Sequence, residues 1–308
     1  MKTLSSNSKN WFVVLFTLVT TIAFTSCGST EGDSIIDEKI PLSTDVPFYV
    51  TLSAYSGDEN ITSQGRIENA ILYVFDENDN YYTQIAVDKS YLLEAKPIAI
   101  SCPNSKKITV AVWSGIVANK ENISSMSKAN ILSDLVVSVN HENGIAKIQP
   151  TDIFYGKAVI YKNATTKAQT QELKIESKVA SMAILTKNVA KSDNDANAIY
   201  TYRIRSTKSS FNANGELTGN DIEFAVPATV GDNGCVVSGT FFIMPSSNVT
   251  IELIKNGTTI LSSKNFQNME NVSVNAGKKT VVTFDYAKQN SNFYIANWNS
   301  VSQIVEVG

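Results

Sequence analysis

Apolar and polar residues alternate along most of the chain after Pro47, and this two-residue period is typical of β-strands that bury one face. The clearest case is the segment 48–55, in which Phe48, Val50, Leu52 and Ala54 are apolar and the residues between them are more polar. The pattern therefore predicts that a half-buried strand opens the folded part of the chain.

A denser apolar run, residues 67–76, ends in the turn cluster 77–80, and residues 81–87 then alternate again. Two apolar runs separated by a short polar turn predict a β-hairpin. Residues 128–139 are the best helix candidate, although their β-branched side chains oppose it. Further strands are predicted at 108–113, 153–161, 173–185, 200–206, 221–226, 236–244, 249–261, 272–274 and 280–285.

Many short strands separated by Asn-Gly and similar turns predict an all-β chain rather than a parallel α/β sheet. The length allows two separate cores. We therefore predict two tandem β-sandwich domains of transthyretin-like or Greek-key type. The predicted bounds are 46–175 for the N-terminal domain and 176–289 for the C-terminal domain, followed by a tail at 290–308 that forms a last edge strand or is offered to another subunit.

The N-terminus has the layout of a secretory signal, which predicts a signal peptide at 1–26. Two lysines precede an apolar run at 11–23, which is shorter than the ~20 residues of a membrane-spanning helix. Small residues then lead to Cys27. A cysteine at this point resembles a bacterial lipobox, whose thiol is acylated, with Phe24 in place of the usual Leu. The alternative is a secreted protein in which Cys27 is incidental.

Residues 27–45 are small, polar and acidic, and they predict a flexible tether between the lipid and the fold. Glu31 and Asp33 resemble the signal that sends Bacteroidetes lipoproteins to the outer face of the outer membrane. The predicted location is therefore the cell outer membrane, with the protein exposed at the surface.

The charge of the chain and its reactive side chains argue against several classes of function. The chain has 26 Lys and Arg against 29 Asp and Glu, without basic runs, and this argues against a nucleic-acid partner. With His141 as its single histidine, the chain offers no nucleophilic triad, metal-ligand spacing or phosphate loop, so neither a cofactor nor an enzyme is predicted. Cys102 and Cys235 fall in different predicted domains, which favours two buried thiols over a disulfide.

Short segments resemble the Bacteroidales fimbrillin superfamily, the subunits of type V pili. Residues 67–76 (IENAILYVFD), preceded by Arg66, are similar to its strand I-x-x-L-x-V-x-V-F-D-x-x-G, with Asn80 where Gly is common. Segments 110–115 and 154–156 resemble the branch of fimbrial anchors and minor subunits. Segments 211–215 and 277–285 resemble the second domain.

The resemblance implies a structural subunit of a cell-surface fimbrium that takes part in donor-strand assembly. In polymerising members a trypsin-like protease cuts after an Arg, which removes the lipid and the first strand, and a strand from another subunit fills the groove. Here Arg66 is the candidate cleavage site, and the strand that would leave contains Phe48, Val50, Leu52 and Ala54. The candidate donor strand contains Val301, Ile304, Val305 and Val307.

If Arg66 stays uncut, Cys27 keeps its lipid, and we favour this anchor or accessory role, with other fimbrial subunits and the outer membrane as partners. In that case Arg66 is a solvated loop residue after Gly65. The alternatives are a polymerising stalk subunit cut after Arg66, a surface lipoprotein that binds glycan or host protein, and a hydrolase with scattered carboxylates. Candidate ligand-binding aromatics are Tyr81, Tyr82, Tyr91 and Trp298.

Overall fold

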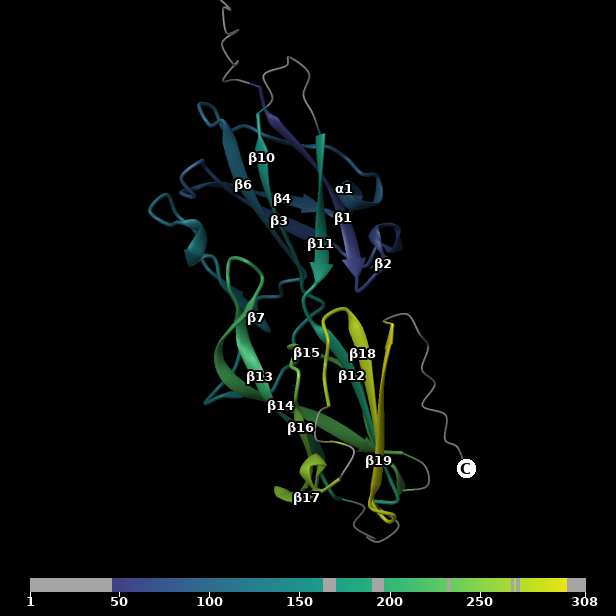
Figure 1. Cartoon of the computed structure of the whole chain (residues 1–308). Coiled ribbons are helices and arrows are strands. Elements are labelled where there is room, and N and C mark those ends of the chain that lie inside the picture. The colour runs from purple at the N-terminus through teal and green to yellow at the C-terminus, as the bar shows by residue number, and fades with distance from the viewer. Residues whose placement is uncertain are drawn as a thin grey trace, which may run out of the picture. The chain divides into compact units, whose positions relative to one another are not determined.

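The structure is a computed structural model that describes residues 46–162, 170–189, 197–231, 234–266, 269 and 272–297. These residues form two large β-sheets (Figure 1). Helical elements are short: α1 (Lys89–Leu93) and the 3-10 turns η1 (Thr62–Gln64), η2 (Leu132–Asp134) and η5 (Ser263–Asn265). Among the described residues, no helix has the length and apolar character needed to cross a membrane. The predicted all-β fold is confirmed.

The first sheet contains the hairpin predicted from residues 67–87. Its strands, in order across the sheet, are β2 (Glu59–Asn60), β1 (Phe48–Ser56), β11 (Thr170–Ser177), β10 (Phe154–Tyr161), β6 (Lys107–Ser114), β3 (Asn69–Phe75) and β4 (Tyr81–Asp88), with β5 (Ile98–Ile100) also paired to β1. β1 and β11 run parallel, and the other pairs of this sheet are antiparallel.

The first sheet bends into a sandwich between β10 and β11, because these two strands are paired over only two residue pairs. The strands on either side of that corner share one apolar core, to which β1 contributes Leu52, β3 contributes Leu72 and β6 contributes Val110. The alternation read from residues 48–55 is confirmed, since Phe48, Val50, Leu52 and Ala54 are all buried.

The second sheet repeats this design. Its strands, in order, are β17 (Thr258–Ser262), β16 (Thr250–Lys255), β13 (Tyr200–Phe211), β14 (Leu217–Val230), β15 (Val236–Ile243), β12 (Ala180–Lys187), β18 (Lys278–Asp285) and β19 (Asn290–Asn297). β14 pairs with β15 only through Thr229 and Val230, so the sheet turns a corner there. The first strand of this sandwich, β12, runs parallel to β18, as β1 does to β11.

Three short strands between β6 and β10 join the second sheet rather than the first. They are β7 (Glu121–Ile123), β8 (Val137–Val139) and β9 (Ile145–Ala146). β8 pairs with β13 and β9 pairs with β14, although all three precede residue 175. The division of the chain into domains at 175 and 176 stays a prediction. The chain itself passes from one sheet to the other between Ser177 and Ala180.

Four local predictions are wrong. Residues 173–185 form two strands, β11 and β12, because the chain passes from one sheet to the other between them. Residues 249–261 form the antiparallel strands β16 and β17, because the chain turns at Asn256 and Gly257. Residues 128–139 hold the short η2 turn and β8 instead of a helix, because Val137 and Val139 are buried on one face of a strand that pairs with Phe211 and its neighbour. Residues 272–274 form no strand: Val274 forms an isolated bridge with Ser246, and the Val272 carbonyl accepts from the Val249 amide at 2.9 Å.

Candidate functional site

The candidate site is the first strand and the segment that leads from it to Arg66. β1 lies side by side with β11 over seven residue pairs, from Tyr49 with Thr170 to Tyr55 with Glu176 (Figure 1). On its other edge, β5 pairs with residues 48–50 and β2 pairs with Tyr55 and Ser56. Both edges of β1 are therefore occupied near both of its ends.

Apolar burial adds to this pairing. Phe48, Val50 and Leu52 are at most 4% exposed, and full burial of such side chains stabilises a fold by about 1.5–3 kcal/mol each. Removal of β1 would expose an apolar trough together with the unpaired ladder of β11. A strand with the same alternating pattern would fit this trough, which β1 itself fills in the described fold.

Polar contacts fix the register of β1. The Ser53 hydroxyl donates to Glu172 Oε1 on β11 at 2.5 Å. The Ala54 amide donates to Thr62 Oγ1 at 2.8 Å, and the Ala54 carbonyl accepts from the Ile61 amide at 2.8 Å. The η1 turn thus closes the edge of β1 between β5 and β2.

Arg66 lies between η1 and β3, directly after Gly65, whose φ of 65° ends the η1 turn. Its Nη2 donates to Asp152 Oδ2 at 2.5 Å, and the two side chains are only 20% and 18% exposed. Asp152 Oδ1 also accepts from Ser177 Oγ, at the end of β11, at 3.2 Å. Burial raises the pKa of Asp152 above its ordinary range, against the pull of Arg66 and Ser177.

Arg66 is therefore ion-paired and largely buried, which differs from the solvated loop residue expected of an uncut site. A trypsin-like protease binds the side chain of the residue before the scissile bond in a deep pocket. In the described conformation the Arg66 side chain points into the protein at Asp152 instead. Cleavage after Arg66 stays a prediction, and it requires this ion pair to open first.

The far end of β1 contacts the second sheet. A Cβ on Gly277 would lie 2.2 Å from the backbone nitrogen of Gly57, so the two backbones approach too closely for any side chain at Gly277. Lys278 Nζ lies 2.9 Å from Asp58 Oδ2 and 3.0 Å from Asn297 Oδ1. The turn after β1 therefore meets the start of β18, and Lys278 links this turn to the end of β19.

Trp113, Tyr155 and Phe211 form a cluster, called the seam below, in which three of the segments that resemble the fimbrillin family meet. The Trp113 ring lies 4.5 Å from the Tyr155 ring and 5.9 Å from the Phe211 ring. The Tyr155 hydroxyl donates to the Ala213 carbonyl at 2.6 Å, and burial raises the pKa of this tyrosine. Segments 110–115, 154–156 and 211–215 thus pack on one another.

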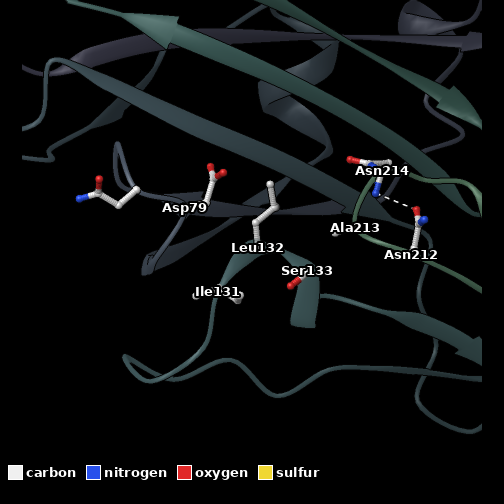
Figure 2. A pocket seen from close by; sticks show the side chains of 8 residues that line it. Asp79, Ile131, Leu132, Ser133, Asn212, Ala213 and Asn214 are labelled. Atoms are coloured by element: carbon white, nitrogen blue, oxygen red, sulfur yellow. Dashed lines mark hydrogen bonds between the residues drawn. The ribbon is translucent and has the colours of Figure 1, made fainter.

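A pocket of about 430 Å³ lies beside this seam (Figure 2). It is lined by polar and apolar residues from the β3–β4 turn, the η2 region and the β13–β14 turn: Asn78, Asp79, Ile131, Leu132, Ser133, Asn212, Ala213 and Asn214. Asp79 is its one carboxylate, so this pocket lacks the pair of carboxylates that glycoside hydrolysis requires.

The described aromatic candidates for ligand binding all have neighbours. Lys128 Nζ lies 4.2 Å from the centre of the Tyr82 ring, and Lys96 Nζ lies 5.8 Å from that of Tyr91. Tyr81 packs edge-on against Phe75. Each of these three rings therefore contacts a different partner.

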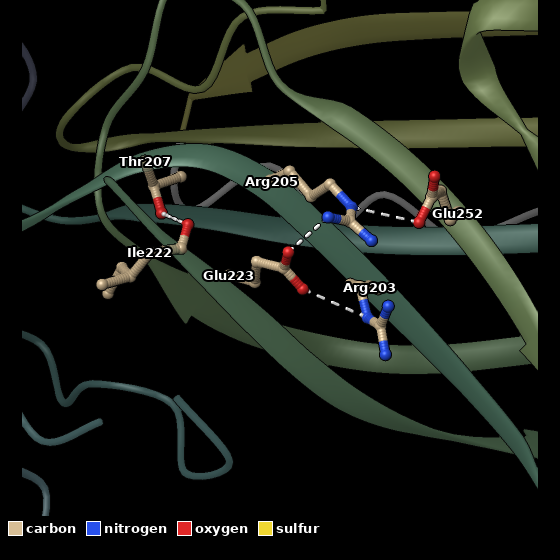
Figure 3. Close-up of polar contacts among 6 residues, drawn as sticks. All are labelled: Arg203, Arg205, Thr207, Ile222, Glu223 and Glu252. Atoms are coloured by element: carbon tan, nitrogen blue, oxygen red, sulfur yellow. Dashed lines mark hydrogen bonds and ion pairs between the residues drawn. The ribbon is translucent and has the colours of Figure 1, made fainter. Parts of the chain in front are cut away.

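Sequence reasoning missed a network of charges on β13, β14 and β16 (Figure 3). Glu223 pairs with both Arg203 and Arg205, and Arg205 also pairs with Glu252 at 3.1 Å. Two cations and two anions balance, so the network leaves no net charge to attract a ligand. The two-residue spacing of the arginines on a predicted strand was the available signal.

Some of the remaining candidate residues lie in the part of the chain that the structure describes, and the others lie outside it. Cys102 and Cys235 are buried free thiols, as predicted. Within the described ranges, no group of three or more His, Cys, Asp and Glu side chains is placed to hold a metal. Cys27, Trp298 and the donor-strand candidates Val301, Ile304, Val305 and Val307 lie outside the described residues.

Comparisons with known proteins agree with this arrangement. The chain is 22% identical over 276 residues to the major fimbrium anchoring subunit FimB of Porphyromonas gingivalis W83, which covers 84% of this chain and 89% of that protein. The fold is similar to the fimbrial anchor protein Mfa2 of Porphyromonas gingivalis, with a TM-score of 0.60, 14% identity, and coverage of 82% of this chain and 98% of that one.

A Bacteroides thetaiotaomicron protein described as a candidate polysaccharide-binding protein also shares the fold, with a TM-score of 0.62, 15% identity, and coverage of 78% of this chain and 92% of that one. The family model for Mfa2, "Fimbrillin-A associated anchor proteins Mfa1 and Mfa2", matches residues 40–304. The match spans most of the chain, and the chain therefore belongs to the Mfa2 family of fimbrillin-A associated anchor proteins.

Proposed function

We propose that this protein is a structural, non-catalytic subunit of a cell-surface fimbria, attached to the outer membrane by lipid as an anchor or accessory subunit. The observation that carries the proposal is the position of β1. This strand is paired on both edges and buries its apolar side chains, so the fold described here is the one in which the first strand is retained. The family and the FimB relatives, named as anchoring subunits, support the same role.

Retention of β1 links the fold to the lipid. Acylation at Cys27 would hold the protein in the membrane through residues 28–47, and the link lasts only while the chain is intact up to Arg66. The partly buried ion pair between Arg66 and Asp152 supports an intact chain, because a protease must open it before binding the arginine.

Neighbouring subunits would join by β-strand addition, in which a donor strand completes the hydrogen-bond ladder of its acceptor. The first part of the predicted tail, residues 290–297, is the edge strand β19, which pairs with β18 over eight residue pairs. We assign the donor role to the part that follows, with Val301, Ile304, Val305 and Val307. A fimbrial subunit with a vacated first-strand groove is the matching partner.

The mass of the intact protein from native outer membrane tests this function. We expect a chain that begins at acylated Cys27. A Cys27→Ser variant should leave the membrane fraction and appear in the medium or periplasm, whereas Cys102→Ser should stay membrane-bound because that thiol is buried. A native chain that begins at Ile67 would contradict the anchor role and support a processed stalk subunit.

A further inference from the structure

β1 is the first element of the fold to receive tension, if the proposed function is correct. A pull on the fimbria would reach the membrane through the chain that precedes Phe48. The structure shows what holds that strand: seven residue pairs to β11, three to β5 and two to β2. The direction of the pull relative to these pairs decides how strongly they resist.

The second sheet contacts the C-terminal end of β1. Gly57 and Asp58, just beyond that end, touch Gly277 and Lys278. The chain from the membrane enters at the opposite end of the strand, at Phe48. A force between the membrane and a partner bound at the second sheet therefore acts along the axis of β1.

Because β1 and β11 are parallel, this force acts on the β1–β11 pair as shear. β11 continues from Ser177 into β12 of the second sheet. Tension thus pulls the start of β1 and the end of β11, which are opposite ends of a parallel pair, in opposite directions. In this geometry the ladder hydrogen bonds along the pair are stretched together, whereas peeling the strands apart from one end would break them one after another.

Side chains add resistance to sliding. Phe48, Val50 and Leu52 are buried in the first core, and each would have to pass its neighbours before β1 could leave. The hydrogen bond from Ser53 to Glu172 also spans the sliding interface. We propose that the parallel β1–β11 pair is a mechanical clamp that lets this protein resist unfolding when it is pulled from its N-terminal side.

Single-molecule force spectroscopy tests the clamp on the soluble chain from Gly28 to Gly308, with one handle at the N-terminus. The second handle is placed at Glu176→Cys, at the end of β11, or at Thr170→Cys, at its start. Both side chains are exposed, and the native thiols are buried in the folded protein. The first position shears the β1–β11 pair, and the second peels it, so the two variants control for each other.

We expect the unfolding force at equal loading rate to be at least about twofold higher with the handle at Glu176→Cys than at Thr170→Cys, because forced unfolding follows the unfolding rate along the pulled direction. Equal forces, or a lower force in shear, would overturn the clamp. This result is independent of the proposed function, which would fail instead if native protein lacked the lipid or began at Ile67.

Discussion

The first strands of the two sandwiches occupy the same place in the topology, and they differ in how they are held. β1 and β12 each run parallel to a later strand, β11 or β18. β12 also pairs with β15 through six residue pairs, and its residues from Ala180 to Thr186 are all buried. β1 alternates between buried and half-buried residues except at Ser53, which is also buried, and its second edge is covered by two short strands and a turn.

From this difference we infer which strand is suited to exchange. A strand buried on both faces at the centre of a sheet cannot leave without the collapse of its sandwich. A strand that buries one face, and is covered on its second edge by short segments, leaves a defined trough that another strand of the same pattern can fill. Within the described fold, β1 has this second character and β12 has the first.

The largest expected effect comes from removal of β1. A chain that begins at Ile67 should lose amide hydrogen-exchange protection in β11 while β12 and β18 stay protected. A synthetic peptide of residues 46–58 should restore the protection of β11, because it rebuilds the parallel ladder and fills the trough. Exchange detected by mass spectrometry measures both states.

The matched control is the same peptide with Leu52→Asp, which places a charge in the apolar core and should restore nothing. If protection of β11 does not depend on β1, or if β12 loses protection equally, the distinction between the two strands is wrong.

A smaller effect is expected where β1 meets the second sandwich. Gly277→Ala places a Cβ 2.2 Å from the Gly57 nitrogen at a φ of 67°. We expect the free energy of unfolding to fall by about 1–3 kcal/mol, from strain and from separation of the backbones. Gly257→Ala has a φ of 85° but nothing within 4 Å of its Cβ, so it measures the backbone strain alone. Equal losses in urea denaturation would mean that the close approach of the backbones adds nothing.

The smallest effect concerns pH and the ion pair near the end of β11. Burial raises the pKa of Asp152 in the folded protein, so the folded state binds a proton more tightly than the unfolded chain. The contribution of this carboxyl to stability should therefore grow as pH falls through its raised folded pKa toward the ordinary value, and should be lost again as pH rises. Each unit of pKa difference corresponds to about 1.4 kcal/mol.

Denaturation measures the free energy of unfolding of the wild type and of Asp152→Asn between neutral pH and about pH 4. We expect the wild type to gain stability relative to the variant as the pH falls. Asp221→Asn is the control, because its carboxylate is 72% exposed in its pair with Lys208. A pH-independent difference for Asp152→Asn would contradict the assigned shift.

Local pattern predicted most of the strands, because alternation along a segment reports which face is buried, whatever the partner strand is. The hairpin at 67–87 and the strand at 48–55 were predictable from the sequence for this reason. The pairing of β1 with β11 was not, because the two strands are separated by most of the first sandwich. Arg66 and Asp152 are 86 positions apart in the sequence, so a local pattern could not predict their ion pair either.

The three-residue strands were also beyond prediction. β7 and β8 bury too few side chains to show a period, and they are stabilised by pairing with each other and with β13. The helix predicted at 128–139 was wrong because tertiary pairing overrode a weak local preference. The lipid site and the donor segment were predicted from sequence alone, and the mass of the native protein and the Cys27→Ser variant test the lipid site.

The seam around Tyr155 has a consequence for how such chains diverge. A Cβ on Gly215 would lie 2.3 Å from an atom of the Tyr155 ring, so a side chain is tolerated at 215 only if the aromatic ring at 155 is replaced by something smaller. Positions 155 and 215 should therefore covary among relatives, although 60 residues separate them. A pair of linked substitutions at this seam would distinguish chains that keep this packing from those in which the two sandwiches meet in another way.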